Sequence, residues 1–286
     1  MSKFRQLFYS LLIILFLSNL SLVAKAGTDL NLWPHWLVCN PLSHETVDHA
    51  MWQNFLTKYV KSVNQYYNLV DYAHVSSQDK QNLEAYLKYL SHITISNYNR
   101  SEQLAYWLNL YNALVVKIIL DNYPVESIQQ IDLDSGITSF FQNGPWKSPL
   151  ITIEGQRIAL DDIEHRIIRP IWSDARTHYA LVCAALTCPK LQISPYLGNR
   201  LNQQLNAAAH EYINSPQGVT VNNGSLVLSK IFSWFQIDFG NSEPAVIRHL
   251  MIYANPQLRE KLKHFKKVTD YRYDWSLNSY PQKNLH

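Results

Sequence analysis

Cysteine is scarce in this sequence: the 286 residues contain Cys39, Cys183 and Cys188 and no other cysteine. So low a count excludes a disulfide-scaffold protein, and the odd number leaves at least one thiol unpaired while the pairing itself stays open. Glycine is also scarce, with 8 residues, whereas 13% of the chain is aromatic. This composition indicates an ordinary, well-packed globular domain.

The N-terminal segment has the features of a secretory signal. Lys3 and Arg5 precede an apolar run, and the run ends in an A-x-A cleavage pattern at residues 24–26. These features predict a signal peptide over residues 1–26, with an uncleaved anchor helix as the alternative. The residue directly after the cleavage site is Gly27 and not a cysteine, which argues against a lipoprotein. We therefore expect a periplasmic or secreted chain with no stable membrane anchor after signal cleavage.

The rest of the chain has no excess of positive or of negative side chains. Residues 1–26 hold three basic residues and no acid, so the remaining 286 − 26 = 260 residues carry 25 − 3 = 22 basic and 22 acidic side chains. A balanced, sparsely charged surface argues against nucleic acid and against an anionic membrane face as partners.

Repeats, low-complexity tracts and linkers are also absent, and the fold class predicted is α+β with a single domain. Residues 27–90 are expected to form a helical lead-in that packs with residues 91–286 as one globular unit. The chain is expected to wrap around a helix at 102–122, which is apolar on nearly every side. Asn109 and Asn112 favour a core helix over a membrane span, and each should have a hydrogen-bond partner. We expect this buried helix to pack on a mostly antiparallel sheet.

Shorter patterns predict the elements around that helix. Ser101 is expected to cap it, and Asp161 is expected to cap a later helix, with Glu164 completing a capping box. The remaining predictions are β-hairpins at 150–160 and 219–228, a short strand at 125–133, and a buried strand at 179–186.

Two segments, 160–170 and 174–189, contain the densest set of reactive side chains: Asp161, Asp162, Glu164, His165, Arg176, His178, Cys183 and Cys188. Such a set could provide a thiolate beside a histidine, a zinc site, or a Glu164–His165 acid/base pair. The spacing of the two cysteines is poor for zinc, so no metal and no cofactor are expected.

Each of these side chains also has a purely structural interpretation. Glu164 could only cap a helix, His178 could only bond the backbone, and Cys183 could be a small buried hydrophobe. On a strand, the two-residue period would keep Cys183 on the face opposite His178.

Several blocks together resemble the family called domain of unknown function 547: AYWLNLYNAL, LDDIEHRIIRP, HYALVCAALTCP, SKIFSWFQIDFG and YDWSLN. The resemblance runs from about Glu102 to Asn278. The family lacks an established activity, so the resemblance implies a shared fold but no particular reaction. The positions that it carries over are Trp107, Asn109, Tyr111, Asn112, Asp161, Glu164, His165, Arg176, His178, Cys183, Cys188, Ser229, Trp234 and Asp238.

The layout of a buried helix followed by strands also resembles the papain and transglutaminase-like enzymes. Their nucleophilic cysteine lies at the start of the central helix, but residues 101–112 contain no cysteine. Either Cys188 supplies the thiol from elsewhere, or the scaffold has lost that chemistry.

Three functions compete. The first is a thiol-dependent hydrolase or acyl transferase, in which Cys188 attacks, His178 is the base with His165 nearby, and Glu164 or Asn109 orients it. Arg176 would bind a substrate carboxylate.

The second function is a binding module for a small-molecule or peptide ligand, whose pocket Asn109 and Asn112 help to shape between the aromatic walls Trp107, Tyr111 and Trp234. The third is a structural network, without a cavity, that joins Asn109, Asn112, Glu164 and His165. The sequence does not predict the oligomeric state.

Overall fold

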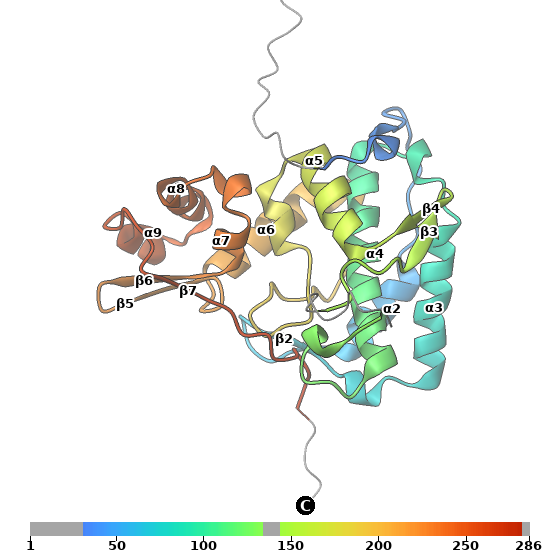
Figure 1. The fold of residues 1–286 in the computed structure, drawn as a ribbon, viewed down its shortest axis with the longest axis horizontal. Helices are drawn as coiled ribbons and strands as arrows, with labels where there is room; N and C mark the ends of the chain where they lie inside the picture. The colour runs from blue at the N-terminus through green and yellow to red at the C-terminus, as the bar shows by residue number, and fades with distance from the viewer. Residues whose placement is uncertain (1–30, 134–143, 282–286) are drawn as a thin grey trace, which may run out of the picture. The chain divides into compact units, whose positions relative to one another are not determined.

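The computed structural model describes residues 31–133 and 144–281; the predicted signal peptide at 1–26 lies outside these residues. These described residues belong to one compact unit. The α+β class is confirmed, because helices alternate with short strands along the chain (Figure 1).

The helices are α2 (Ala50–Tyr59), α3 (Ser77–Ser91), α4 (Arg100–Asn122), α5 (Arg169–Trp172), α6 (Leu201–Ile213), α7 (Ile231–Trp234), α8 (Glu243–Tyr253) and α9 (Pro256–Leu262). The 3-10 helices are η1 (Pro34–Leu37), η2 (Tyr72–His74), η3 (Ile95–Asn97), η4 (Ile128–Gln130), η7 (Ala175–Tyr179), η8 (Gly198–Arg200) and η9 (Gln236–Phe239), while η6 (Asp162–Ile168) is a π-helix. The strands are β1 (Val60–Ser62), β2 (Asn68–Val70), β3 (Ile151–Ile153), β4 (Gln156–Ile158), β5 (Val219–Asn222), β6 (Ser225–Ser229) and β7 (Asp270–Arg272).

The predicted central helix is α4. Its N-cap is Asn99 rather than Ser101, since the Asn99 Oδ1 accepts from the backbone N–H groups of Ser101 and Glu102 at 3.1 and 3.0 Å. The helix ends at Asn122, just before Tyr123-Pro124, because a residue that precedes proline resists the α region. By length and composition α4 could cross a membrane, but 94% of its most apolar window is buried inside the protein, as in a core helix.

The surroundings of α4 differ from the prediction in one respect. The strands form three small sheets, β1–β2, β3–β4 and β5–β6–β7, rather than one sheet beneath the helix. All pairings between them are antiparallel except β6–β7. Both predicted hairpins are confirmed as β3–β4 and β5–β6. The helix α4 packs mainly against α3, η8 and η6, and the papain-like layout is not confirmed.

The helix that follows the first hairpin is a π-helix for a local reason. Pro170 has no N–H to donate to the carbonyl of Arg166, so a regular α-helical bond cannot form there. The Arg166 carbonyl instead accepts from the backbone N–H of Trp33 at 2.9 Å, and the N–H of Arg169 bonds the carbonyl of Glu164. The predicted capping box is wrong, because Asp161 makes no side-chain cap bond and is already helical.

Two predicted strands are also wrong. Residues 125–133 contain the 3-10 helix η4 instead of a strand. The apolar run at 179–186 begins at the end of η7 and continues as a loop, in which Ala184 has a φ of 57°. That run is mostly buried as predicted, but an apolar run fits a buried loop as well as a buried strand, so periodicity alone could not distinguish the two.

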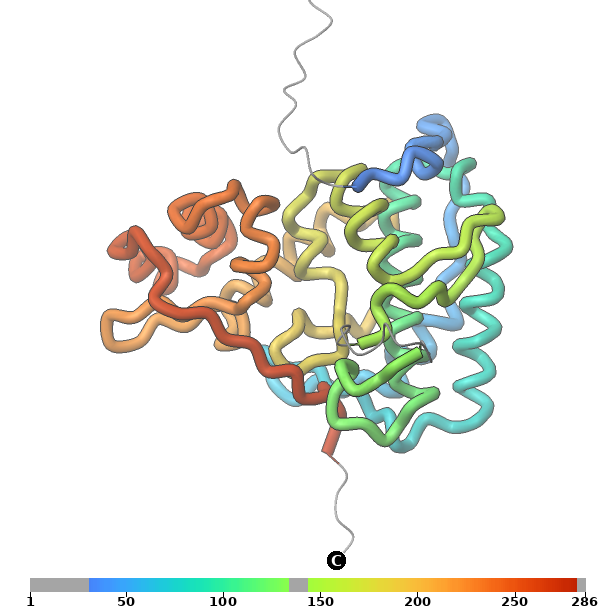
Figure 2. The backbone as a smooth tube through the Cα atoms, in the orientation of Figure 1, coloured from blue at the N-terminus to red at the C-terminus, as the bar shows by residue number. Residues whose placement is uncertain are grey.

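Two hydrophobic clusters make up the core, one around α2, α3 and α4 and one around α6, α7 and α8. The segment after β7, red in Figure 2, extends from the second cluster to the first. On its way it pairs with the loop at 184–187, where the Leu186 N–H bonds the Ser276 carbonyl at 2.8 Å and the Asn278 N–H bonds the Ala184 carbonyl at 2.9 Å. Its end is bound by Tyr72, whose hydroxyl donates to Asn278 at 3.0 Å.

The contact between α4 and η8 requires a glycine. A Cβ at Gly198 would lie 2.9 Å from the backbone nitrogen of Glu102, closer than real Cβ atoms approach. We expect Gly198→Ala to lower the free energy of unfolding by about 1–3 kcal/mol, the usual cost of overpacking. Urea unfolding measures it, with Asn199→Ala at the exposed neighbouring position as the control. Equal stability of the two variants would contradict the close approach.

Candidate functional site

A cavity of about 370 Å³ lies where the first part of η6, the loop after η7 and the segment after β7 meet. Five aromatic side chains form much of its wall: Trp146, Trp234, Phe235, Tyr273 and Trp275. The polar groups at the cavity are Tyr111, Lys147, Asp161, Glu164, His165, His178, Cys183 and Cys188. A cavity of this size with a few converging polar groups is the usual form of a small-molecule site.

Six of the ten predicted site residues line this cavity: Tyr111, Glu164, His165, His178, Cys188 and Trp234. Tyr111 of α4 therefore lines the same cavity as the histidine-bearing segments, whereas Asn109 and Asn112 do not line it. The predicted network without a cavity is therefore wrong.

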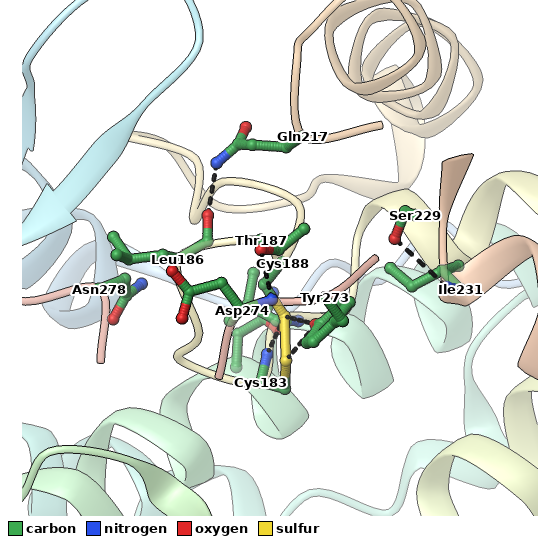
Figure 3. The surroundings of a disulfide bond; sticks show 12 residues. Cys183, Leu186, Thr187, Cys188, Gln217, Ser229, Ile231, Tyr273, Asp274 and Asn278 are labelled. Atoms are coloured by element: carbon green, nitrogen blue, oxygen red, sulfur yellow. Dashed lines mark hydrogen bonds between the residues drawn. A yellow bond between two sulfur atoms is a disulfide. The ribbon is translucent and has the colours of Figure 1, made fainter. Parts of the chain in front are cut away.

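The predicted nucleophile is not a free thiol. Cys188 forms a disulfide with Cys183, with their Cα atoms 6.2 Å apart, and Cys39 is the unpaired cysteine. Figure 3 shows the hydroxyl of Tyr273 beside the disulfide; it donates to the sulfurs of Cys183 and Cys188 at 2.9 and 3.2 Å. A disulfide sulfur has no thiolate to attack an acyl carbon, so the mechanism predicted for Cys188 does not operate in this form.

His178 lies between two carboxylates. Its Nε2 is 2.7 Å from Asp238 Oδ2, and its Nδ1 faces Glu164 Oε1 at 3.8 Å; its side chain is 2% exposed. Burial alone would raise the pKa of Asp238, but hydrogen bonds from His178 and Arg169 lower that pKa to about 2. The ionised Asp238 therefore accepts from Nε2–H, which leaves Nδ1 as the nitrogen that faces the cavity side.

Arg169 connects the two histidines of the site. Its Nε donates to Asp238 Oδ2 at 2.7 Å, and one terminal nitrogen donates to His165 Nδ1 at 3.0 Å. Phe235 fixes the ring plane of His178, since the two rings stack with centroids 4.2 Å apart, and the Arg169 guanidinium lies 5.1 Å from the centre of the Phe235 ring. The position of His178 is thus determined by both hydrogen bonding and stacking.

Glu164 is the most buried acid that lines the cavity. Its side chain is 14% exposed, against 34% for Asp161, and its Oε2 accepts from the Tyr111 hydroxyl at 3.4 Å. Burial, and then the nearby Glu164, raises the pKa of Tyr111 well above its ordinary value, so this hydroxyl stays protonated. Lys147, the basic residue of the wall, is exposed at the rim.

Asn109 and Asn112 have the hydrogen-bond partners that the sequence led us to expect, but neither side chain lines the cavity. The partners of Asn112 are backbone groups, and those of Asn109 are backbone groups and the ring of His49, which lies 3.2 Å from its amide nitrogen. Asn112 donates to the Ala180 carbonyl at 2.9 Å and accepts from the Val182 N–H at 3.0 Å. Asn109 makes the same two bonds to Tyr196, at 2.7 and 3.0 Å. Both residues therefore fix loops to α4 rather than contact a ligand, and Asn112 fixes the loop that follows His178.

Two other predicted binding residues also lie elsewhere. Trp107 is buried against Trp36, with ring centroids 4.9 Å apart. Arg176 bonds Asp174 through Nε and a terminal nitrogen, at 3.0 and 2.6 Å, and lines a different surface cavity beside α6. Arg169, four residues after His165, is the arginine beside the site, but it bonds Asp238 and His165 and does not line the cavity.

The sequence reasoning missed Arg169, Tyr273 and the wall residues Trp146, Phe235 and Trp275. Phe235 and Trp275 lie within the SKIFSWFQIDFG and YDWSLN blocks, so their aromatic density was an available signal. The available signal for Arg169 was its place in the LDDIEHRIIRP block, four residues after His165.

Among residues 31–133 and 144–281, no group of three or more His, Cys, Asp and Glu side chains is arranged to hold a metal ion.

The fold and the site define an α+β protein with an aromatic-walled, acid-bearing cavity beside a disulfide. Residues 95–213 match the model of the family described as "Protein of unknown function, DUF547", which confirms over that range the resemblance seen in the sequence. Trp234 and Asp238 lie beyond the matched residues. Neither a curated protein nor a solved structure matches this chain.

Proposed function

We propose that the cavity binds a small ligand with a flat apolar body and a cationic or hydrogen-bond-donating head group. The observation that carries the proposal is the combination of aromatic walls with a single poorly exposed acid, Glu164, beside His178. Aromatic faces attract flat apolar groups and cations, and a carboxylate in a partly dry site favours an ammonium group over an anion.

The same arrangement supports acid/base chemistry on the bound ligand. Asp238 holds His178 by its Nε2, and the 3.8 Å gap between His178 Nδ1 and Glu164 Oε1 is too long for a direct hydrogen bond. A ligand atom beside the two groups, within hydrogen-bond distance of both, could exchange a proton with either of them. The thiol-dependent hydrolase is not proposed for this form, because both pocket cysteines are in the disulfide.

We also propose that the protein is exported. The N-terminal pattern over residues 1–26 supports this location, and so does the Cys183–Cys188 disulfide, since disulfides persist in oxidising compartments.

The binding proposal is tested with three probes that share one ring: benzylamine, benzyl alcohol and benzoate. Ligand-observed NMR should show benzylamine binding at least about tenfold more tightly than benzoate, because only the amine pairs with Glu164. In Glu164→Gln this preference should fall by about tenfold. Trp234→Ala should weaken all three probes, since it removes part of the wall.

Glu260→Gln is the matched control, because Glu260 is an exposed acid, 65% exposed and far from the cavity wall, that pairs with Lys263. It should leave every affinity unchanged. Failure of all three probes to bind, or a preference for benzoate, would refute the proposal.

A further inference from the structure

The disulfide is part of the cavity wall rather than of the core alone. Both Cys183 and Cys188 line the cavity, but their exposure differs: Cys183 is partly exposed, whereas Cys188 is 4% exposed. A nucleophile that enters the cavity therefore reaches the sulfur of Cys183 first.

The buried sulfur has two donors in place. The backbone N–H of Cys183 lies 2.8 Å from Cys188 Sγ, and the Tyr273 hydroxyl lies 3.2 Å from Cys188 Sγ and 2.9 Å from Cys183 Sγ (Figure 3). Cys188 Sγ thus has two donors, whereas Cys183 Sγ has the shared hydroxyl. Burial, followed by the effects of Tyr212 and Glu164, holds the pKa of Tyr273 well above its ordinary value, so its hydroxyl stays a donor. Hydrogen bonds of this kind stabilise a thiolate and make it a better leaving group.

The loop that carries the disulfide is anchored at several points, so the two sulfurs stay close after the bond opens. The Thr187 carbonyl accepts from the Tyr212 hydroxyl at 2.9 Å, and the Thr187 hydroxyl accepts from the Asp274 N–H at 2.8 Å. Between the cysteines, Ala184 holds the left-handed φ of 57° that an alanine rarely adopts. We expect these contacts to keep Cys188 beside its hydrogen-bond donors both when Cys183 is bonded to Cys188 and when it is bonded to a substrate sulfur.

From this geometry we infer a second activity, thiol–disulfide exchange with small-molecule thiols inside the cavity. A substrate thiolate attacks Cys183 Sγ and forms a new S–S bond; the Cys183–Cys188 bond breaks, and its electron pair leaves on Cys188 Sγ. A second substrate thiolate then attacks the substrate sulfur of the mixed disulfide and releases Cys183 as a thiolate. Two thiols are thereby oxidised to one disulfide, the protein disulfide is reduced to two thiols, and a small-molecule disulfide reverses the sequence.

The test uses the full chain carrying Cys39→Ser, which removes the unpaired thiol, with 2-mercaptoethanol as the probe. Mass spectrometry under native conditions should show reduction of the disulfide through a mixed disulfide at Cys183. Adding Tyr273→Phe should slow this reduction by about tenfold, whereas Tyr271→Phe, two residues earlier and in contact with neither sulfur, should not change it.

The choice of sulfur is tested in the reverse direction with bis(2-hydroxyethyl) disulfide. In the Cys39→Ser background, the thiol left by Cys188→Ser should form a mixed disulfide at least about tenfold faster than the thiol left by Cys183→Ser. Equal rates, or a disulfide that 2-mercaptoethanol reduces only as fast as the chain unfolds, would show a purely structural bond and overturn the inference. Because the probe is neutral and no amine is present, this result is independent of the binding proposal.

Discussion

Replacing Asn112 by leucine is expected to lower the free energy of unfolding by about 4 kcal/mol. The side chain is 2% exposed, and it satisfies the Ala180 carbonyl and the Val182 N–H, which belong to residues that are themselves buried. Leucine is similar in volume but leaves both backbone groups without a partner, at about 1–3 kcal/mol each, and adds the loss of the two bonds themselves. Urea unfolding gives the value from the shift in midpoint at constant slope.

Asn122→Leu is the matched control for this change. Asn122 also donates to a backbone carbonyl, that of Ile118 at 2.8 Å, but it lies exposed at the C-terminal end of the same helix. Its replacement should cost less than about 1 kcal/mol, because water can replace the lost bond. If Asn112→Leu lowered the free energy of unfolding no more than Asn122→Leu does, the claim that Asn112 fixes the loop after His178 to α4 would be wrong.

The second large effect is a loss of stability in mild acid that depends on His49. This ring is 4% exposed; its Nε2 accepts from the Asn109 amide at 3.2 Å, and its Nδ1 lies 2.6 Å from the Tyr86 hydroxyl. Burial lowers the pKa of His49 to about 4, although the nearby Asp48 acts in the opposite direction. Because the Asn109 amide already donates to Nε2, an added proton there would face another donor.

The sign of the effect follows from proton binding. Between pH 6.5 and about 4 the unfolded chain binds a proton at His49 that the folded chain does not, so acid favours unfolding. The contribution is fully present above pH 6.5 and falls by about 1.4 kcal/mol per pH unit, or about 3 kcal/mol in total. Burial also lowers the pKa of His249 to about 4, so the informative quantity is the difference between wild type and His49→Gln.

Denaturant unfolding at several pH values from about 7 to about 4.5 measures this difference. The slope of stability against pH should be smaller in His49→Gln than in wild type, and unchanged in His74→Gln, whose ring is exposed. If His49→Gln does not fold, NMR titration of wild type gives the pKa of His49 directly. An ordinary value near 6.5 would contradict the claim that burial lowers this pKa.

The elements that could be predicted from the sequence are those whose pattern is local. The helix α4 is apolar on nearly all sides, and Glu154-Gly155 in the first hairpin supplies the positive φ values, 46° and 77°, that its tight turn needs. The segment at 179–186 was mistaken for a strand because an apolar run fits a buried loop equally well. The contacts that determine its loop conformation come mostly from elsewhere in the chain. They are the hydrogen bonds to Asn112 of α4, the backbone pairing with the segment after β7, and the Cys183–Cys188 disulfide.

Part of the site could also be predicted, because some of its residues stand in local sequence patterns. Glu164, His165 and His178 came from dense blocks of polar residues, and their meeting at a hollow was foreseen. Arg169 was missed because its partner Asp238 lies 69 residues away in the sequence, and the sequence alone does not show that pairing. The buried asparagines were assigned to a ligand because a sequence shows that a carboxamide needs hydrogen-bond partners but not which groups provide them.

The central claim, that this cavity holds a ligand head group between Glu164 and His178, is tested most directly by a crystal structure of the protein with benzylamine. We expect the amine nitrogen within about 3.2 Å of a Glu164 carboxylate oxygen, with the ring against the aromatic wall around Trp234. An empty cavity at saturating benzylamine, or a ring bound with its amine directed away from Glu164, would contradict the account.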